Sequence, residues 1–312
     1  MGKRLNGDSL LRNLYKHKGL ALLALPGFIL MFMFAYMPMV GLVAAFKQYD
    51  YTLGLFGSEW IGIENFKMLL VSKDTTIRII RNTVLYWCLF TSVGTVMYVA
   101  IAVMIYECSS NRFGKLSHMV MIFPTFVSWV AISYIVKAYL NDGNGMFNHI
   151  LLSLGMSEIP WYLTPKYWPA ILLCVHVWKN CGYGAVIYLS ALSGIDPCLF
   201  EAAELDGATK WQRTKYITLP MLKSMVSINV LLALGGIMYS NTGLFYQVTR
   251  NTGILYSTTQ TIDAYIMNVM TTGSNSLGST AAVTLFQSLF GCVMVVFVNW
   301  IVRRKDEENA LF

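Results

Sequence analysis

The chain alternates long apolar runs with shorter polar segments, and six of the runs are long enough to cross a bilayer. A helix needs about 20 consecutive, mostly apolar residues to span the hydrocarbon core of a membrane. We therefore predict an all-α membrane protein with six transmembrane helices. The runs cover residues 19–46, 83–106, 119–140, 168–192, 221–239 and 280–302.

Composition leads to the same class of protein. Of the 312 residues, 56% are hydrophobic and only 12% are charged, with a mean hydropathy of +0.54, whereas soluble domains carry about 25% charged residues. The six cysteines form no CxxC pair, and the four histidines show no metal-ligand spacing. The sequence therefore predicts neither a zinc site nor a disulfide framework, and no metal or cofactor is expected in this chain.

The distribution of Lys and Arg predicts the orientation, because positive residues in short loops are retained in the cytoplasm. With the N-terminus inside, fourteen of the 23 Lys and Arg residues fall in cytoplasmic segments, seven in outer loops, and two, Lys137 and Lys179, inside spans. Both termini are thus predicted to be cytoplasmic. The net charge of +7 follows from this topology and requires no nucleic-acid partner.

The predicted layout has a tail at each end and a core of five helices after the first. The first run is far longer than the apolar core of a signal peptide, which has about 7 to 15 residues, so we expect it to stay attached. The parts are a cytoplasmic tail at 1–18, the first transmembrane helix at 19–46, an outer loop at 47–82, the core at 83–302 with a cytoplasmic loop at 193–220, and a cytoplasmic tail at 303–312.

Local signals predict finer features of the helices and loops. Pro26, Gly27 and Pro38 interrupt the first span, which a membrane helix tolerates when neighbours satisfy the freed backbone groups. Asn82 and Thr83 are candidates to cap the second span. Short surface helices are expected at 146–154 and 261–270.

The loop between the fourth and fifth spans carries the most specific pattern. Asp196 is a good N-cap, Pro197 suits the first helical position, and Gly207 is a C-cap signal. Thr209 can cap a second short segment, which Pro220 is expected to break at the entrance to span five. Two short helices joined at a glycine predict a rigid elbow.

This loop resembles the signature of the permease subunits of binding-protein-dependent ABC importers. That signature reads EAA, three residues, G, nine residues, I, one residue, LP. Every element has its counterpart here at the family spacing, whereas an isolated EAA would carry no information. The matching residues are Glu201, Ala202, Ala203, Gly207, Ile217, Leu219 and Pro220.

The resemblance implies that the loop is a coupling helix that docks in a groove of an ATPase subunit. Glu201 would then pair with a basic residue of the ATPase, Ala202 and Ala203 would allow close approach, and Gly207 beside Asp206 would turn the chain. ATP and Mg²⁺ would be bound by that partner, because this chain contains no GxxxxGK[ST] sequence. Further implied partners are a second homologous permease, a second ATP-binding subunit and an extracellular solute-binding protein, in a bacterial plasma membrane.

Other stretches make the chain similar to the oligosaccharide branch of that family, the maltose-type and polysaccharide-type permeases. This similarity implies an oligosaccharide as cargo. The stretches are LLALPGFILMFMFAYMPMVGLVAAFKQYD, WIGIENF, NTVLYW and VWKNCGYGAVIYLSALSGIDPCLFEAAELDGA.

The middle of span four supplies the main candidates for a substrate path. A lysine at mid-bilayer costs about 2.5 to 3.5 kcal/mol on insertion scales, so Lys179 should face a wet cavity or a partner. Asn180 follows it, and glycines on both sides of Tyr183 predict a loosened helix. Our hypothesis is that these three residues and Trp178 line or support the path, and that the aromatic rings stack on the faces of sugar rings. The alternative is that Lys179 is a fixed interhelical partner.

Weaker candidates lie in the neighbouring spans. Trp129 and Tyr134 in span three, and Tyr239 and Asn241 at the outer end of span five, are within reach of a central cavity. Aromatic residues in membrane helices also serve as packing or as interfacial anchors, and that alternative stays open for these residues.

Three alternatives to an importer of oligosaccharides differ in the residues that they require. An ABC importer permease for a non-sugar solute would share the coupling loop. An ion-gradient-driven secondary transporter would need carboxylates near mid-membrane, and the predicted spans contain none. An intramembrane enzyme would need a nucleophile and a base, or a metal cluster, at the same depth. The sequence therefore favours a transport subunit without enzymatic activity of its own.

Overall fold

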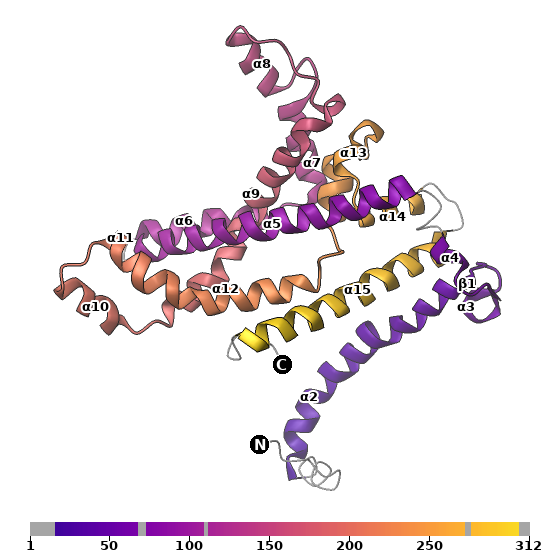
Figure 1. Ribbon diagram of the computed structural model, residues 1–312, viewed down its shortest axis with the longest axis horizontal. Coiled ribbons are helices and arrows are strands. Elements are labelled where there is room, and N and C mark those ends of the chain that lie inside the picture. The colour runs from indigo at the N-terminus through magenta and orange to yellow at the C-terminus, as the bar shows by residue number, and fades with distance from the viewer. Residues whose placement is uncertain (1–15, 68–72, 109–111, 272–275, 306–312) are drawn as a thin grey trace. The chain divides into compact units, whose positions relative to one another are not determined.

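The computed structural model describes residues 16–67, 73–108, 112–271 and 276–305, which are mostly helical (Figure 1). The described residues form two units, one comprising 16–67 with 276–285 and the other 73–271 with 286–305. The last helix, α15 (Ser276–Lys305), contributes to both.

The first unit is built on the first apolar run. The run is helical throughout, but its geometry changes from α-helix in α2 (Lys18–Met31) to π-helix in η1 (Phe32–Tyr36) and 3₁₀-helix in η2 (Met37–Phe46). Pro26 lies inside α2 and Pro38 lies in the first turn of η2. The predicted interruptions therefore change the helix type without ending the span.

A short loop closes this unit. Strands β1 (Lys47–Gln48) and β2 (Glu59–Trp60) pair antiparallel and form a small two-stranded sheet that the all-α prediction missed. The amide of Asn65 donates hydrogen bonds to the carbonyl oxygens of Ala45 at 3.0 Å and Lys47 at 2.9 Å, which ties the end of η2 to the loop. The remaining helices here are α3 (Gly54–Gly57) and α4 (Glu64–Lys67).

The second unit contains the elements that position the candidate site. Two long helices, α5 and α9, pack closely against each other. The elements are α5 (Lys73–Cys108), α6 (Arg112–Ile122), η3 (Phe123–Phe126), α7 (Trp129–Leu140), α8 (Met146–Ser153), η4 (Trp161–Leu163), η5 (Pro165–Tyr167), α9 (Trp168–Ser193), α10 (Pro197–Leu205), α11 (Lys210–Arg213), η6 (Thr214–Thr218), α12 (Leu219–Leu234), η7 (Gly243–Val248), η8 (Gly253–Leu255), α13 (Tyr256–Thr259) and α14 (Ile262–Thr271).

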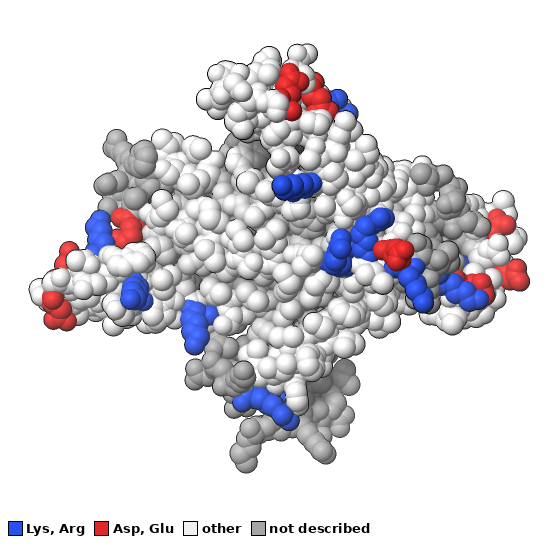
Figure 2. All heavy atoms as spheres, turned by 45° about the horizontal axis from the view of Figure 1, so that its top comes forward, with Lys and Arg blue, Asp and Glu red and all other residues white. Residues whose placement is uncertain are grey.

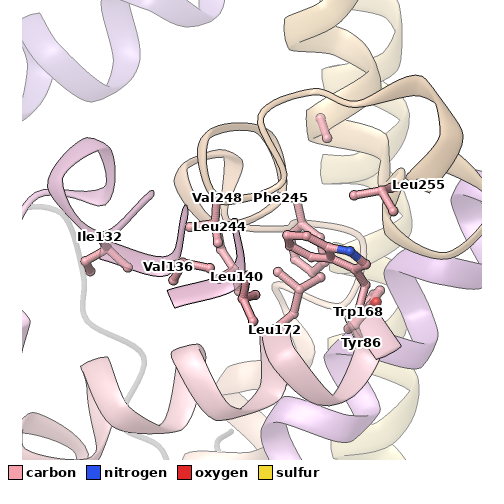
Figure 3. Packing of buried hydrophobic residues seen from close by; sticks show 11 residues of the cluster. Tyr86, Ile132, Val136, Leu140, Trp168, Leu172, Leu244, Phe245, Val248 and Leu255 are labelled. Atoms are coloured by element: carbon pink, nitrogen blue, oxygen red, sulfur yellow. The ribbon is translucent and has the colours of Figure 1, made fainter. Parts of the chain in front are cut away.

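Two clusters of buried apolar side chains hold this unit together. One joins α5, α9 and α12 through residues such as Ala102, Ala185 and Leu222. The other surrounds Trp168, whose indole N–H donates to the carbonyl oxygen of Trp161 at 2.8 Å. Figure 3 shows Trp168 with Leu172 from the same helix and with Tyr86 and Leu255 from other elements. Burial of these side chains supplies the main packing energy of the unit.

By length and apolar composition, five helices in the described part of the chain can cross a membrane, and six if one bent pair counts as a single span. Figure 2 shows that most of the side chains on the visible surface are uncharged. The five are Lys18–Phe46, Lys73–Glu107, Pro165–Ser193, Lys210–Leu234 and Leu277–Arg304.

The predicted third span is the bent pair. The apolar run is continuous in sequence, but the structure breaks it between Leu116–Phe126 and Trp129–Leu140 with a bend of 98°. Pro124 lies in the 3₁₀ turn before the break, and Ser128 caps the new helix by accepting a hydrogen bond from the N–H of Ala131 at 3.2 Å. A straight helix was expected here, and that expectation was wrong because proline and an N-cap serine together start a second helix.

Other boundaries also differ from the predictions. Helix α5 begins at Lys73, so Asn82 and Thr83 lie inside it and do not cap it. The Thr83 hydroxyl instead accepts a hydrogen bond from the N–H of Ile262, the first residue of α14, at 3.0 Å. Helix α12 ends at Leu234, five residues before the predicted end of span five. Helices are present at both expected positions, 146–154 and 261–270, as α8 and α14, but α14 is not the surface helix that was expected, because nearly all of its residues are half-buried or buried.

Pro220 does not break the chain as expected. It lies in the first turn of α12, directly after the π-helical η6, and the segment Lys210–Leu234 continues as one helix. The π-helical turn departs from the regular i→i−4 hydrogen-bond pattern, so a proline directly after it, which has no N–H to donate, does not end the helix.

Candidate functional site

The elbow between spans four and five has the caps that the sequence predicts. Asp196 accepts a hydrogen bond from the backbone N–H of Cys198 at 2.9 Å, and this bond holds the pKa of the carboxyl below its usual value. Thr209 and Gln212 form a reciprocal capping box at the start of α11. Gly207 lies between the two helices with φ of +76°, a conformation that favours glycine. The conformation of the elbow is therefore set by hydrogen bonds and a glycine within the loop itself.

The residues of the EAA pattern lie on the exposed part of this elbow. Glu201 and Ala202 are exposed, Ala203 is half-buried, and Asp206 forms the C-cap of α10. The carboxylate of Glu204 pairs with the guanidinium of Arg213 at 3.4 Å and so links the two short helices. Farther along, Ile217 is half-buried, whereas Leu219 and Pro220 at the start of α12 are exposed.

Large apolar side chains surround the charged ones on the elbow. Leu205 is 90% exposed and Trp211 is 72% exposed. Large exposed apolar side chains that lie together are typical of a surface that another protein covers.

A cavity of about 440 Å³ lies between α5, α9 and the segment after α12. Its walls combine aromatic rings, hydroxyl groups and amides, and none of the described residues that line it is Lys, Arg, Asp or Glu. The lining residues are Thr83, Tyr86, Trp87, Phe90, Thr91, Thr95, Tyr98, His176, Asn180, Tyr183, Gly184, Ile187, Tyr188, Asn229, Ala233, Tyr239, Ser240, Asn241 and Phe245.

Several of these side chains are fixed by neighbours. The His176 ring stacks on Phe90 with centroids 4.1 Å apart, and the Asn180 amide donates to the carbonyl oxygen of His176 at 2.8 Å. The Trp87 indole N–H donates to the carbonyl oxygen of Ala233 at 3.0 Å. The cavity therefore presents rigid rings and oriented polar groups.

The packing of α5 on α9 depends on a glycine in the cavity wall. A Cβ atom on Gly184 would approach the ring of Tyr98 to 2.6 Å. The absence of a side chain at this position lets Tyr98 lie against α9 and reach within 3.5 Å of His176.

The structure separates the predicted path residues into two groups. Asn180, Tyr183, Tyr239 and Asn241 line the cavity. The other four, Trp129, Tyr134, Trp178 and Lys179, do not.

The second group has other neighbours. The Lys179 ammonium donates to backbone carbonyl oxygens and lies 5.0 Å from the centre of the Trp129 ring. Tyr134 is 62% exposed and packs under the guanidinium of Arg250. Trp178 is 44% exposed and borders a separate hollow beside α7.

Sequence reasoning missed most of the wall that α5 provides. Thr83, Trp87, Phe90 and Tyr98 lie three, four or eight residues apart, so they share one face of the helix. This stripe of polar and aromatic residues within an apolar run is the signal that identifies a cavity-facing side. His176, on α9, carries no comparable signal.

A half-buried carboxylate next to the cavity was also missed. Asp263 accepts hydrogen bonds from the N–H of Ser240 at 2.5 Å, the hydroxyl of Ser240 at 3.0 Å and the amide of Gln287 at 3.3 Å. Burial raises the pKa of Asp263 despite these donors. Ser240 lines the cavity, so Asp263 fixes part of its wall from behind.

Comparisons with known proteins identify the relatives of this chain. A profile of the family described as binding-protein-dependent transport system inner membrane component matches residues 100–307. A polygalacturonan/rhamnogalacturonan transport system permease protein of Bacillus subtilis, YteP, is 28% identical over 96% of this chain and 92% of its own length. Protein LplB of the same organism is 30% identical over 97% of this chain and 94% of its own length.

A solved structure shares the fold. A chain of a bacterial alginate ABC transporter, in complex with an alginate pentasaccharide-bound periplasmic protein, superposes with a TM-score of 0.81. It is 28% identical, and the match covers 95% of this chain and 97% of that one.

Proposed function

Because the chain belongs to the family of inner membrane components of binding-protein-dependent transport systems, we propose that it forms half of the translocation pathway of an ATP-driven oligosaccharide importer. The chain is the transmembrane subunit of a binding-protein-dependent importer. We propose in addition what the cargo is, where the pathway lies and how transport is coupled to ATP hydrolysis.

The lining of the cavity is the observation that best supports an oligosaccharide as the cargo. Sugar rings offer apolar faces and many hydroxyl groups, which aromatic rings and neutral hydrogen-bonding groups bind well. The walls contain both kinds of group, including Trp87, Tyr183, Asn180 and Asn229, without a charged side chain among the described lining residues. YteP and the alginate transporter are named for polysaccharides, which supports the same class of cargo.

The elbow supports the proposal that ATP hydrolysis by a separate subunit drives transport. In this proposal α10 and α11 dock on the ATPase, with Glu201 paired to a basic residue and Ala202 and Ala203 at the closest approach. The ATPase binds ATP and Mg²⁺. A stiff elbow transmits a displacement to α12, because α11, η6 and α12 form one continuous helical segment from Lys210 to Leu234.

The remaining partners follow from the same assembly. A second homologous permease would complete the pathway, two ATP-binding subunits would grip the elbows, and a solute-binding protein would deliver cargo to the outer loops. The orientation with both termini in the cytoplasm, in a bacterial plasma membrane, rests on the excess of Lys and Arg in the predicted inner segments.

Two alternatives make different predictions. A permease for a non-sugar solute would keep the elbow but would not transport oligosaccharides. A secondary transporter would move cargo without an ATPase and would respond to an ion gradient.

The test is uptake by proteoliposomes that contain the chain with its second permease and ATPase, supplied with its binding protein and radiolabelled alginate or galacturonan oligosaccharides. We expect ATP-dependent uptake, reduced at least about tenfold by Asn180→Leu, since one lost polar contact of about 1.4 kcal/mol is a factor of ten. Cys174→Ser, on an exposed part of the same helix, is the matched control. Equal uptake by both variants would remove the cavity from the pathway.

A further inference from the structure

Lys179 is a charged residue buried in the middle of α9, only 7% exposed. A buried ammonium is costly unless its donors are satisfied. In the described part of the chain no carboxylate pairs with Lys179, and it does not line the cavity. Its partners therefore explain why the charge is there.

The partners are three carbonyl oxygens at the break in the third span. The ammonium donates to the carbonyl of Pro124 at 3.2 Å, of Thr125 at 2.9 Å and of Val127 at 2.6 Å. The last carbonyls of a helix have no intrahelical donor, and the C-terminal end of a helix attracts a cation. Lys179 thus occupies the position where the 98° bend leaves backbone acceptors free.

The contact is reciprocal and close. The hydroxyl of Thr125 donates to the backbone carbonyl of Lys179 at 2.9 Å. One turn farther along α9, Gly182 packs so tightly on the backbone of Met121 that a side chain there would overlap it. The arm before the bend is therefore held against α9 at two points.

The bend is linked to the cavity through Trp129. The Trp129 ring lies 5.0 Å from the Lys179 ammonium, within the range of a cation–π interaction. The same side chain packs on Gly243, where an added Cβ would collide with it. Gly243 begins η7, which contains the cavity-lining Phe245 and follows the cavity-lining Asn241.

We propose that Lys179 is a positioning residue of the importer, whose ammonium fixes the bend of the third span and, through Trp129, the segment 239–245 in the cavity wall. The link to transport rests on the proposed function, because it takes the cavity as the cargo pathway. The fixing of the bend does not depend on the cargo. A neutral residue of similar length leaves the carbonyl oxygens of Thr125 and Val127 without this donor, whereas Pro124 keeps the N–H of Val127, and the bend is released.

The test measures the bend directly by pulsed electron spin resonance. Spin labels replace Leu116 and Ala138, two exposed residues on the two arms, in a background in which the native cysteines are replaced. With a rise of 1.5 Å per residue, arms of about 16 and 15 Å at 98° place the two Cα atoms about 20 Å apart, and a straight helix would place them about 31 Å apart. The measurement uses the full chain in its assembled complex.

We expect Lys179→Met to broaden the distance distribution and shift it by several ångströms toward the longer value, and Lys179→Arg to restore it, because a guanidinium also donates to several acceptors. Lys137→Met is the matched control: it removes a lysine from α7 that forms no hydrogen bond or ion pair with the described residues. The control distribution should equal that of the parent.

An unchanged distribution in Lys179→Met overturns the proposal. If Lys179→Met does not accumulate in the membrane, the same distance is measured in Lys179→Gln, which keeps a donor but is shorter and neutral. A distribution equal to that of the parent in Lys179→Gln would again contradict the role of the ammonium. Since no cargo is present, failure here is distinct from failure of oligosaccharide uptake.

Discussion

Gly182→Ala tests the close contact between α9 and the end of α6. A Cβ atom at this position would meet the backbone nitrogen of Ile122 at 2.6 Å and would overlap the carbonyl group of Met121. Because these atoms belong to the backbone, one helix must move as a whole. Overpacking of this kind costs about 3 kcal/mol, and alanine returns about 1 kcal/mol of helix propensity. The net loss is therefore about 2 kcal/mol.

The assay is thermal unfolding of the purified complex in detergent, followed by a fluorescent probe of cysteine exposure. At about 2–4 °C per kcal/mol, the loss predicts a midpoint lower by about 4–8 °C. The matched control is Gly194→Ala at the end of the same helix, where the nearest atom to the added Cβ is the carbonyl oxygen of Ala191 at 3.5 Å. A Gly182→Ala midpoint equal to that of the control would refute the packing described for α6 and α9.

Three further predictions concern the elbow and the wall behind the cavity. Burial raises the pKa of Asp263 above 3.8, so the folded state binds the proton more tightly than the unfolded state. The free energy of unfolding therefore falls as the pH rises from 3.8 through the raised pKa of the folded state. Melting curves from pH 4 to pH 7 should show this loss in the parent and not in Asp263→Asn; parallel curves would contradict it. Thr209→Ala removes the capping box of α11 and should cost about 1 kcal/mol of local stability, seen as faster hydrogen exchange in α11 but not in α9. Glu201→Lys should lower co-purification of the ATPase at least about tenfold, since reversing a charge at an interface costs several kcal/mol. The control Glu204→Gln only breaks the internal pair with Arg213 and should retain the ATPase. Equal retention by both variants would show that Glu201 does not contact the ATPase.

The hydropathy pattern was sufficient for most of the spans, because a long apolar run has few alternatives to a membrane helix. It failed at residues 119–140, where the run stays apolar through the bend. The decisive signals there are local, Pro124 and the capping Ser128, and their consequence depends on Lys179, which lies more than 50 residues away in sequence. No single-segment pattern contains that contact.

The candidate site shows the same limit. Lys179 and Asn180 are neighbours at the middle of α9, and the sequence places both near a path. Successive residues on a helix point about 100° apart, so Asn180 lines the cavity while Lys179 faces the bent span. The packing of α5, α6 and α7 around α9 decides which neighbour each of these two residues faces. The elbow, in contrast, is built from local caps, so both ends of α10 and the start of α11 were predictable from Asp196, Gly207 and Thr209, although the break expected at Pro220 was wrong.

The most direct test of the account is uptake of radiolabelled oligosaccharide by proteoliposomes, with the solute-binding protein and ATP supplied, in the presence and absence of the ATPase subunits. The account predicts uptake only when the ATPase is present and ATP is hydrolysed. Uptake at an equal rate by vesicles that contain this chain without any ATPase would contradict it.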